Sequence, residues 1–127
     1  MEKTENALNW FEIAVNDIKR AQKFYETVFE IEMHSDEMMG MKMAVFITDD
    51  STGKVSGALV QSDMHKPGVD GVTIYLNGNP DLDIPLGKIN GAGGKVLMPK
   101  TLVSDNVGYM AFFMDTEGNK IGLHSRN

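Results

Sequence analysis

The residue that most suggests a chemical role is Glu12, an acid within the otherwise apolar segment Trp10–Val15 of WFEIAVND. Two further polar groups lie in apolar segments elsewhere: His124 near the end of the chain and Tyr75 in the run VTIYLN. A glutamate and a histidine that meet transfer protons as base and acid, and a tyrosine hydroxyl polarises a carbonyl group. Glu12 and His124 are therefore the candidate catalytic residues.

The same side chains also have interpretations without catalysis. They could orient a ligand in an apolar pocket, or Glu12 could be a structural acid that bonds to strand-end amides or to His124. His124 lies three residues before the last residue, where side chains are often solvated. The other two histidines, His34 and His65, lie at a strand edge and in a loop, so we expect both at the surface.

A regular order of strands and helices must position these residues. Apolar runs and alternation predict strands over eight ranges: 8–15, 31–34, 41–48, 55–61, 72–77, 96–98, 108–114 and 120–125. A turn at DDSTG, residues 49–53, separates the third strand from the fourth.

Two helices are predicted between these strands. Asn16 and Asp17 supply an N-cap, and Ile18, Ala21 and Tyr25 follow at helical spacing. The second helix begins near Asp83 and ends at GAGG, residues 91–94, because glycine accepts the left-handed conformation of a helix C-cap.

This order of elements is duplicated: a strand, a helix and three strands occur twice. MAVF at 43–46 returns as MAFF at 110–113, and the first strand and helix of each half start at similar offsets. An internal repeat of this kind indicates a domain built from two equivalent modules.

Composition excludes several classes of protein. The chain of 127 residues is long enough for one domain with a substantial core. It contains no cysteine, which excludes disulfides and thiolate chemistry. The net charge of −6 argues against a nucleic-acid partner. The polar N-terminus and the absence of a long apolar run predict a cytoplasmic protein without a membrane partner.

Three stretches of the sequence resemble a known superfamily: WFEIAVNDIKRAQKFYETVF at 10–29, NGAGGKVLMPKT at 90–101 and GYMAFFMDTEGNKIGLH at 108–124. The chain resembles the vicinal oxygen chelate superfamily, the group of glyoxalases, bleomycin resistance proteins and extradiol dioxygenases. The resemblance implies an α+β fold in a single domain, 1–127. Two βαβββ modules, 8–62 and 70–125, would form mixed sheets that curl around a shared cleft.

Metal-dependent members of that superfamily place His, Gln or Glu at four strand positions. The resemblance puts three of these positions on Trp10, Thr73 and Gly122. The fourth falls in the fourth predicted strand, on one of Gly57, Leu59 and Gln61. A divalent cation needs several converging imidazole or carboxylate donors, which an indole, a hydroxyl and a glycine do not supply. We therefore expect no metal at this site and no cofactor.

Side chains of a strand alternate between its two faces, which assigns residues to the implied cleft. In the first strand Phe11, Ile13 and Val15 are expected beneath the helices, so Trp10 and Glu12 face the cleft. In the last strand, Ile121 and Leu123 are expected beneath the helices in the same way. The complete set expected to bind a ligand in one cavity is Trp10, Glu12, Gln61, Thr73, Tyr75, Gly122 and His124.

Three classes of function remain. The first is a protein similar to the bleomycin-resistance branch that binds a small hydrophobic or aromatic molecule in a metal-free cleft. The second is a glyoxalase-like lyase or isomerase, with Glu12 and His124 as proton carriers or with a metal at an unusual site. The third is an interaction module with a vestigial cleft. The missing metal ligands favour the first, and the resemblance implies a homodimer.

Overall fold

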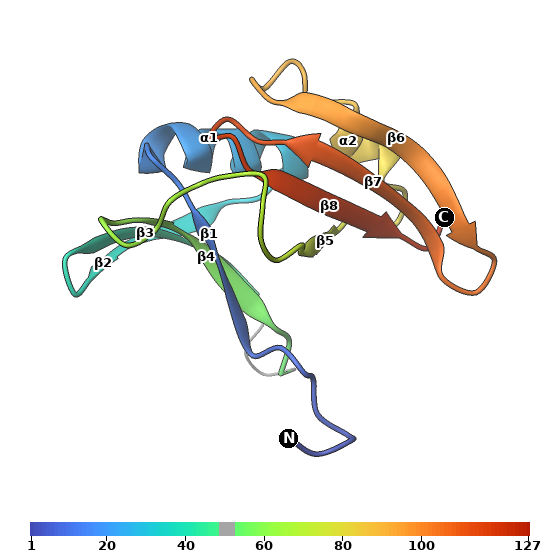
Figure 1. The fold of residues 1–127 in the computed structure, drawn as a ribbon, viewed down its shortest axis with the longest axis horizontal. Helices are drawn as coiled ribbons and strands as arrows, with labels where there is room; N and C mark the ends of the chain where they lie inside the picture. Colours follow the sequence, from blue (N-terminus) through green and yellow to red (C-terminus); the bar gives the residue numbers. More distant parts are fainter. Residues whose placement is uncertain (49–52) are drawn as a thin grey trace.

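The computed structural model describes residues 1–48 and 53–127, which form a duplicated α+β fold (Figure 1). The first module contains β1 (Trp10–Ala14), α1 (Ile18–Phe29), β2 (Met33–Met38), β3 (Met41–Phe46) and β4 (Ser56–Gln61). The second contains β5 (Tyr75–Asn77), α2 (Asp83–Leu86), β6 (Lys95–Ser104), β7 (Gly108–Met114) and β8 (Lys120–Ser125).

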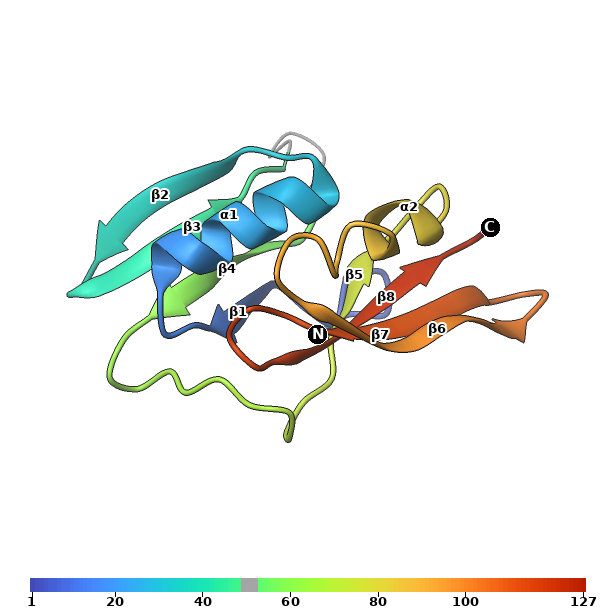
Figure 2. The ribbon, with the colours of Figure 1, turned by 90° about the horizontal axis from the view of Figure 1, so that it is seen from above.

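Each module folds into a four-stranded mixed sheet. Sheet A has the strand order β1-β4-β3-β2, and sheet B has the equivalent order β5-β8-β7-β6. In both, the first strand of the module runs parallel to the last, while the other pairs are antiparallel. The shared topology confirms the predicted fold class of two βαβββ modules. Figure 2 shows α1 lying along sheet A and α2 beside β5.

Helix α1 begins where the sequence predicts it. The Asp17 carboxylate accepts a hydrogen bond of 3.1 Å from the Arg20 N–H, which satisfies one of the free donors of the first turn. Ala21, Phe24, Tyr25 and Val28 form its buried face. The helix ends at Glu30, which adopts the left-handed conformation of a C-cap.

The second module departs from the predicted element lengths. Strand β6 spans ten residues, Lys95–Ser104, instead of three, and its pairing with β7 shifts register three times. Such bulges are not visible as alternation, so the prediction stopped at Met98. Strand β5 is shorter than predicted and β2 runs further, to Met38. Helix α2 begins at Asp83 as predicted but has only four residues.

One apolar core joins the two modules. Phe24 and Tyr25 of α1 lie with their ring centroids 6.0 and 6.4 Å from that of Phe113 on β7. Ile13 and Val15 of the first module are buried in the same cluster, as alternation predicts. The corresponding residues of β8 confirm the prediction too, since Ile121 and Leu123 are buried.

The predicted turn at residues 49–53 falls largely on 49–52, which lie outside the described residues. Within the described ranges, the helices are all too short or too polar to cross a membrane.

Candidate functional site

A cavity of about 720 Å³ lies between the two modules. Both modules contribute to its walls. The first contributes the chain before β1, the end of α1, the end of β3 and the start of β4. The second contributes β5 and the residues before it. The described residues that line it are Leu8, Phe11, Phe29, Ile31, Phe46, Ile47, Thr48, Val55, Ser56, Val72, Thr73, Ile74, Tyr75, Leu76 and Asn77. We call this the inter-module cavity.

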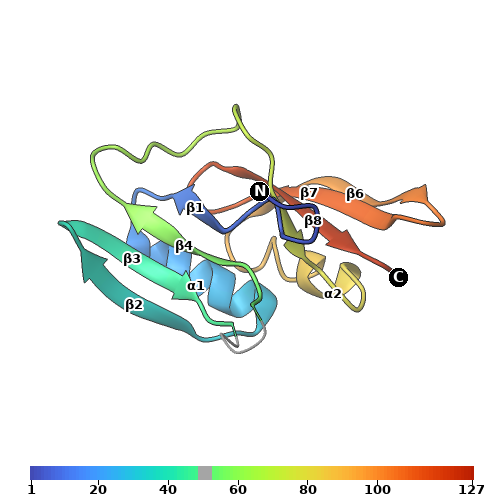
Figure 3. The same cartoon turned by 90° about the horizontal axis from the view of Figure 1, so that it is seen from below.

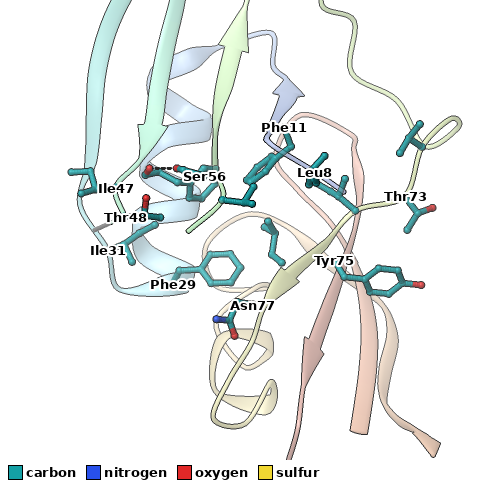
Figure 4. A pocket seen from close by; sticks show the side chains of 15 residues that line it. Leu8, Phe11, Phe29, Ile31, Ile47, Thr48, Ser56, Thr73, Tyr75 and Asn77 are labelled. Carbon is teal, nitrogen blue, oxygen red and sulfur yellow. Dashed lines mark hydrogen bonds between the residues drawn. The ribbon is translucent and has the colours of Figure 1, made fainter. Parts of the chain in front are cut away.

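The walls of the inter-module cavity are mainly apolar. Phe11 and Phe29 point toward its middle from opposite sides, whereas the hydroxyl of Tyr75 points away from it (Figure 4). The polar groups are few and include Thr48, Ser56 and Asn77. An apolar space with a small number of hydrogen-bonding groups is the usual form of a site for a small organic ligand.

A second cavity, of about 460 Å³, runs beside β1. Trp10, Glu12 and Ala14 of β1 line it together with Lys66 and Val69 of the segment 62–74, which passes β1 on its way to β5 (Figure 3). The two cavities adjoin, because they have four wall residues in common: Leu8, Phe11, Val72 and Ile74. We call the second one the β1 cavity.

Four of the expected ligand-binding residues line one of the two cavities, whereas Gln61, Gly122 and His124 line neither. Trp10 and Glu12 line the β1 cavity, and Thr73 and Tyr75 line the inter-module cavity. Gln61 is turned toward α1, where its side-chain oxygen accepts a 2.9 Å hydrogen bond from the Ile18 N–H.

His124 bonds at a different place from Glu12. Its Nε2 lies 2.6 Å from the backbone oxygen of Val107, in the turn before β7. On β8, His124 stands beside Asn77 of β5, on the strand pair that also matches Tyr75 with Gly122.

The histidine that Glu12 contacts is His65. Glu12 Oε1 lies 2.8 Å from His65 Nε2, and Glu12 Oε2 accepts a 3.3 Å hydrogen bond from the indole N–H of Trp10. His65 Nδ1 in turn lies 2.7 Å from the hydroxyl of Ser62. His65, predicted to lie at the surface, has a side chain that is 22% exposed. The spacing Ser62-x-x-His65, directly after a strand that pairs with β1, is the feature of the sequence that could have indicated this contact.

The space beside Gly122 is filled by an aromatic ring. A Cβ atom at Gly122 would lie 2.6 Å from the Tyr75 ring, so the absence of a side chain makes room for tyrosine. The Tyr75 ring also packs against Phe112, with 5.6 Å between the ring centroids. The Tyr75 ring therefore occupies the space that a metal ligand at position 122 would need.

The fourth strand offers no substitute metal ligand. Gly57 and Leu59 pair with Phe11 and Ile13 of β1, on the face beneath α1. The residues that share the face of Glu12 are Ser56, Ala58 and Val60. Among the described residues, three or more His, Asp and Glu side chains never converge as a metal site would require. The donors at these positions thus do not fit the divalent metal of the superfamily.

A buried polar cluster fixes the two modules beside these cavities. Asp115, Glu117 and Asn119 form the turn between β7 and β8 and are all buried. Glu117 accepts hydrogen bonds of 2.9 Å from the N–H groups of Asn16 and Asp17 and forms an ion pair with Arg20. Burial by itself raises the pKa of Glu117, but these hydrogen bonds, Arg20's first, outweigh it and lower the pKa to about 2.

Asp115 and Asn119 complete this cluster. The Tyr25 hydroxyl donates to Asp115 at 2.7 Å, and burial followed by the charge of Asp115 raises the pKa of Tyr25 well above its usual value. The Asn119 amide donates to the backbone oxygen of Ala14 at 2.8 Å, and its oxygen accepts the Gly68 N–H at 2.9 Å. The turn therefore holds β1, α1 and the middle of the β4–β5 segment in place.

A fold of two βαβββ modules with cavities between them is typical of one class of protein. Residues 7–123 match the Glyoxalase/Bleomycin resistance protein/Dioxygenase superfamily. The chain belongs to this family, as the resemblance predicts.

Several solved structures share the fold. A hypothetical protein from S. aureus is 23% identical, with a TM-score of 0.63 and coverage of 97% of this chain and 96% of that one. A glyoxylase/bleomycin resistance protein/dioxygenase domain from Frankia sp. EAN1pec is 14% identical, with a TM-score of 0.71 and coverage of 96% and 98%.

The fosfomycin resistance protein FosX from Listeria monocytogenes is 15% identical, with a TM-score of 0.64 and coverage of 96% and 92%. At these identities the likeness shows the fold alone. Among functionally curated proteins, none matches the chain.

Proposed function

We propose that the protein binds a small hydrophobic or aromatic molecule in the inter-module cavity, without a metal ion. The observation on which this rests is the cavity of about 720 Å³ between Phe11 and Phe29. Its volume falls in the range of small-molecule sites, about 300–1,000 Å³. Aromatic side chains on opposite walls favour a flat apolar ligand, because they offer a large contact area in defined orientations.

The polar groups of the cavity would determine which apolar ligands it prefers. Thr48, Ser56 and Asn77 supply hydrogen-bonding groups at the margin of the apolar walls. A ligand with one or two polar substituents would form hydrogen bonds with these groups, in addition to those that Ser56 and Asn77 form with Phe46 and Asn79, and would bury its remainder against the aromatic rings.

Metal independence belongs to the same proposal and is supported by side-chain chemistry. Trp10, Thr73 and Gly122 stand where the superfamily implies metal ligands, and the Tyr75 ring fills the space beside Gly122. A divalent cation finds no set of imidazole and carboxylate donors there.

Titration with 1-anilinonaphthalene-8-sulfonate, a fluorescent apolar probe, tests the proposal. We expect saturable binding that dialysis against a chelator leaves unchanged. Phe29→Ala removes one aromatic wall and is expected to weaken binding about tenfold, since an aromatic contact contributes about 1.4 kcal/mol.

Tyr109→Ala is the matched control, because Tyr109 is an equally half-buried aromatic residue outside the inter-module cavity. Equal losses in both variants, a requirement for added metal, or no saturable binding would each refute the proposal. Thermal melts of both variants identify any general loss of structure.

A homodimer is part of the proposal. Proteins that resemble this chain commonly pair, and its surface exposes large apolar side chains such as Trp10, Met38 and Leu102. Sedimentation equilibrium is expected to give twice the chain mass of 14.0 kDa. A mass of one chain at micromolar concentration would exclude a stable pair.

The lyase or isomerase reaction expected of Glu12 and His124 stays a prediction. The ligand-binding proposal does not depend on it.

A further inference from the structure

Ser62, His65 and Glu12 form a continuous chain of hydrogen bonds. The Ser62 hydroxyl lies 2.7 Å from His65 Nδ1, and His65 Nε2 lies 2.8 Å from Glu12 Oε1. Ser62 follows the last residue of β4, Glu12 is at the centre of β1, and these two strands are adjacent in sheet A. The three groups therefore converge through the fold, although Glu12 is separated from His65 by 53 positions.

The direction of each proton in this chain follows from Glu12. When Glu12 is the carboxylate and His65 the neutral imidazole, the state in which the ring can accept a proton from serine, the proton between them is on Nε2, because a carboxylate accepts hydrogen bonds only. His65 Nδ1 is then an acceptor in the neutral ring, and the Ser62 hydroxyl donates to it. This is the proton arrangement of a serine activated by a base that a third group orients.

The position of Glu12 suits it for orientation rather than proton transfer. Both of its oxygens are occupied, one by His65 and the other by the indole N–H of Trp10. Two hydrogen bonds fix the carboxylate, which in turn fixes the tautomer and the plane of the imidazole. Glu12 is therefore a positioning residue in this arrangement.

The serine oxygen is also held by the backbone. The Met64 N–H donates to Ser62 Oγ at 3.1 Å. This local hydrogen bond helps to fix the direction of the Ser62 side chain. Ser62 is half-buried and borders a polar depression of about 310 Å³, with Asn16 and Lys42 on its walls.

From this geometry we propose that Ser62 is a nucleophile with esterase activity toward small polar carboxylic esters. Ser62 Oγ forms a bond to the acyl carbon and gives its proton to His65 Nδ1. The bond from that carbon to the alkoxide breaks, and the alkoxide takes the proton from His65 as it leaves. Water then forms a bond to the acyl carbon and gives a proton to His65 Nδ1. The bond between that carbon and Ser62 Oγ breaks, the carboxylic acid leaves, and Ser62 Oγ takes the proton back from His65.

Labelling of the unmodified chain is the first test. Diisopropyl fluorophosphate forms a bond between phosphorus and an activated serine oxygen, and fluoride leaves. Peptide mapping by mass spectrometry is expected to locate the label on Ser62. A label on other residues only, or no label, would overturn the proposal without dependence on any variant.

Hydrolysis of p-nitrophenyl acetate is the second test. Ser62→Ala and His65→Gln are each expected to lower kcat/KM at least a hundredfold. Glu12→Gln is expected to lower kcat at least tenfold and leave KM unchanged, as an orienting residue should.

Ser104→Ala is the matched control, because Ser104 Oγ likewise accepts a backbone N–H, that of Val107 at 3.1 Å. It hydrogen-bonds to no histidine among the described residues, so the wild-type rate is expected. If Ser62→Ala retains the rate while His65→Gln loses it, the imidazole itself attacks the ester and the proposal is wrong. Ser62 does not line the inter-module cavity, so probe binding there tests a separate site.

Discussion

At the scale of single residues, the structure assigns several polar side chains to support rather than to ligand contact. Gln61 bonds to the first turn of α1, and Glu117 receives two backbone N–H groups and Arg20. Both side chains satisfy donors of the helix N-terminus that would otherwise lie unpaired. In the sequence, a polar residue that bonds to a helix end looks the same as a polar residue that contacts a ligand.

The low pKa of Glu117 makes stability depend on pH. The pKa is about 2 in the folded protein and near 4.5 in the unfolded chain, so the folded state favours the ionised form. The stabilisation is complete above pH 4.5 and is lost as the pH falls toward 2. Urea unfolding followed at several pH values is expected to show this loss.

Glu117→Gln should remove most of that acid-dependent loss and lower the free energy of unfolding by about 2 kcal/mol at neutral pH. The exposed Glu37→Gln is the control and should leave the pH profile unchanged. If the pH dependence of stability were the same in Glu117→Gln as in the unmodified protein, the acid sensitivity would come from other groups.

At the scale of elements, strand β5 and strand β8 depend on each other's side chains. Tyr75 pairs with Gly122, and its ring occupies the position that any larger residue at 122 would need. The glycine is therefore required by packing and not by backbone conformation. On the same part of the second sheet, the Tyr75 ring also packs against Phe112 of β7.

Helix α1 is part of the first module but packs against the sheets of both. Its buried face contacts sheet A, and Phe24 and Tyr25 also meet Phe113 of sheet B. Helix α2, with four residues, covers much less of sheet B. The duplication is thus exact in strand order but unequal in its helices.

At the scale of the whole molecule, the turn between β7 and β8 locks one module against the other. Asn119 bonds to Ala14 of β1, to Gly68 and to Asp115, which itself receives the Tyr25 hydroxyl. Because the cavities lie between the modules, their shape depends on this turn.

Asn119→Ala is expected to lower the free energy of unfolding by about 3 kcal/mol, since it breaks three hydrogen bonds of buried or half-buried groups. Chemical denaturation measures this loss. Asn106→Ala is the control, because Asn106 bonds to Arg126 only through its backbone oxygen. A change below 1 kcal/mol in Asn119→Ala would show that this side chain contributes little to holding the modules together.

The sequence by itself determined the duplicated order of elements, the N-cap at Asp17 and the buried faces of β1 and β8. Each of these follows from short-range patterns: capping chemistry, helical spacing and alternation along a strand. The resemblance added the family and the chemistry of the positions at Trp10, Thr73 and Gly122. The lengths of the strands were harder to predict, because the bulges of β6 interrupt the alternation of apolar and polar residues from which a strand is recognised.

Only the tertiary structure decided which side chains meet. Glu12 contacts His65 and not His124, because the segment after β4 returns past β1 while β8 belongs to the other sheet. It also placed four of the expected site residues in two adjoining cavities, left Gln61 and His124 outside both, and filled the space beside Gly122 with Tyr75. Contacts across 53 positions depend on the path of a loop and on how two sheets pack, and local patterns hold no information about either.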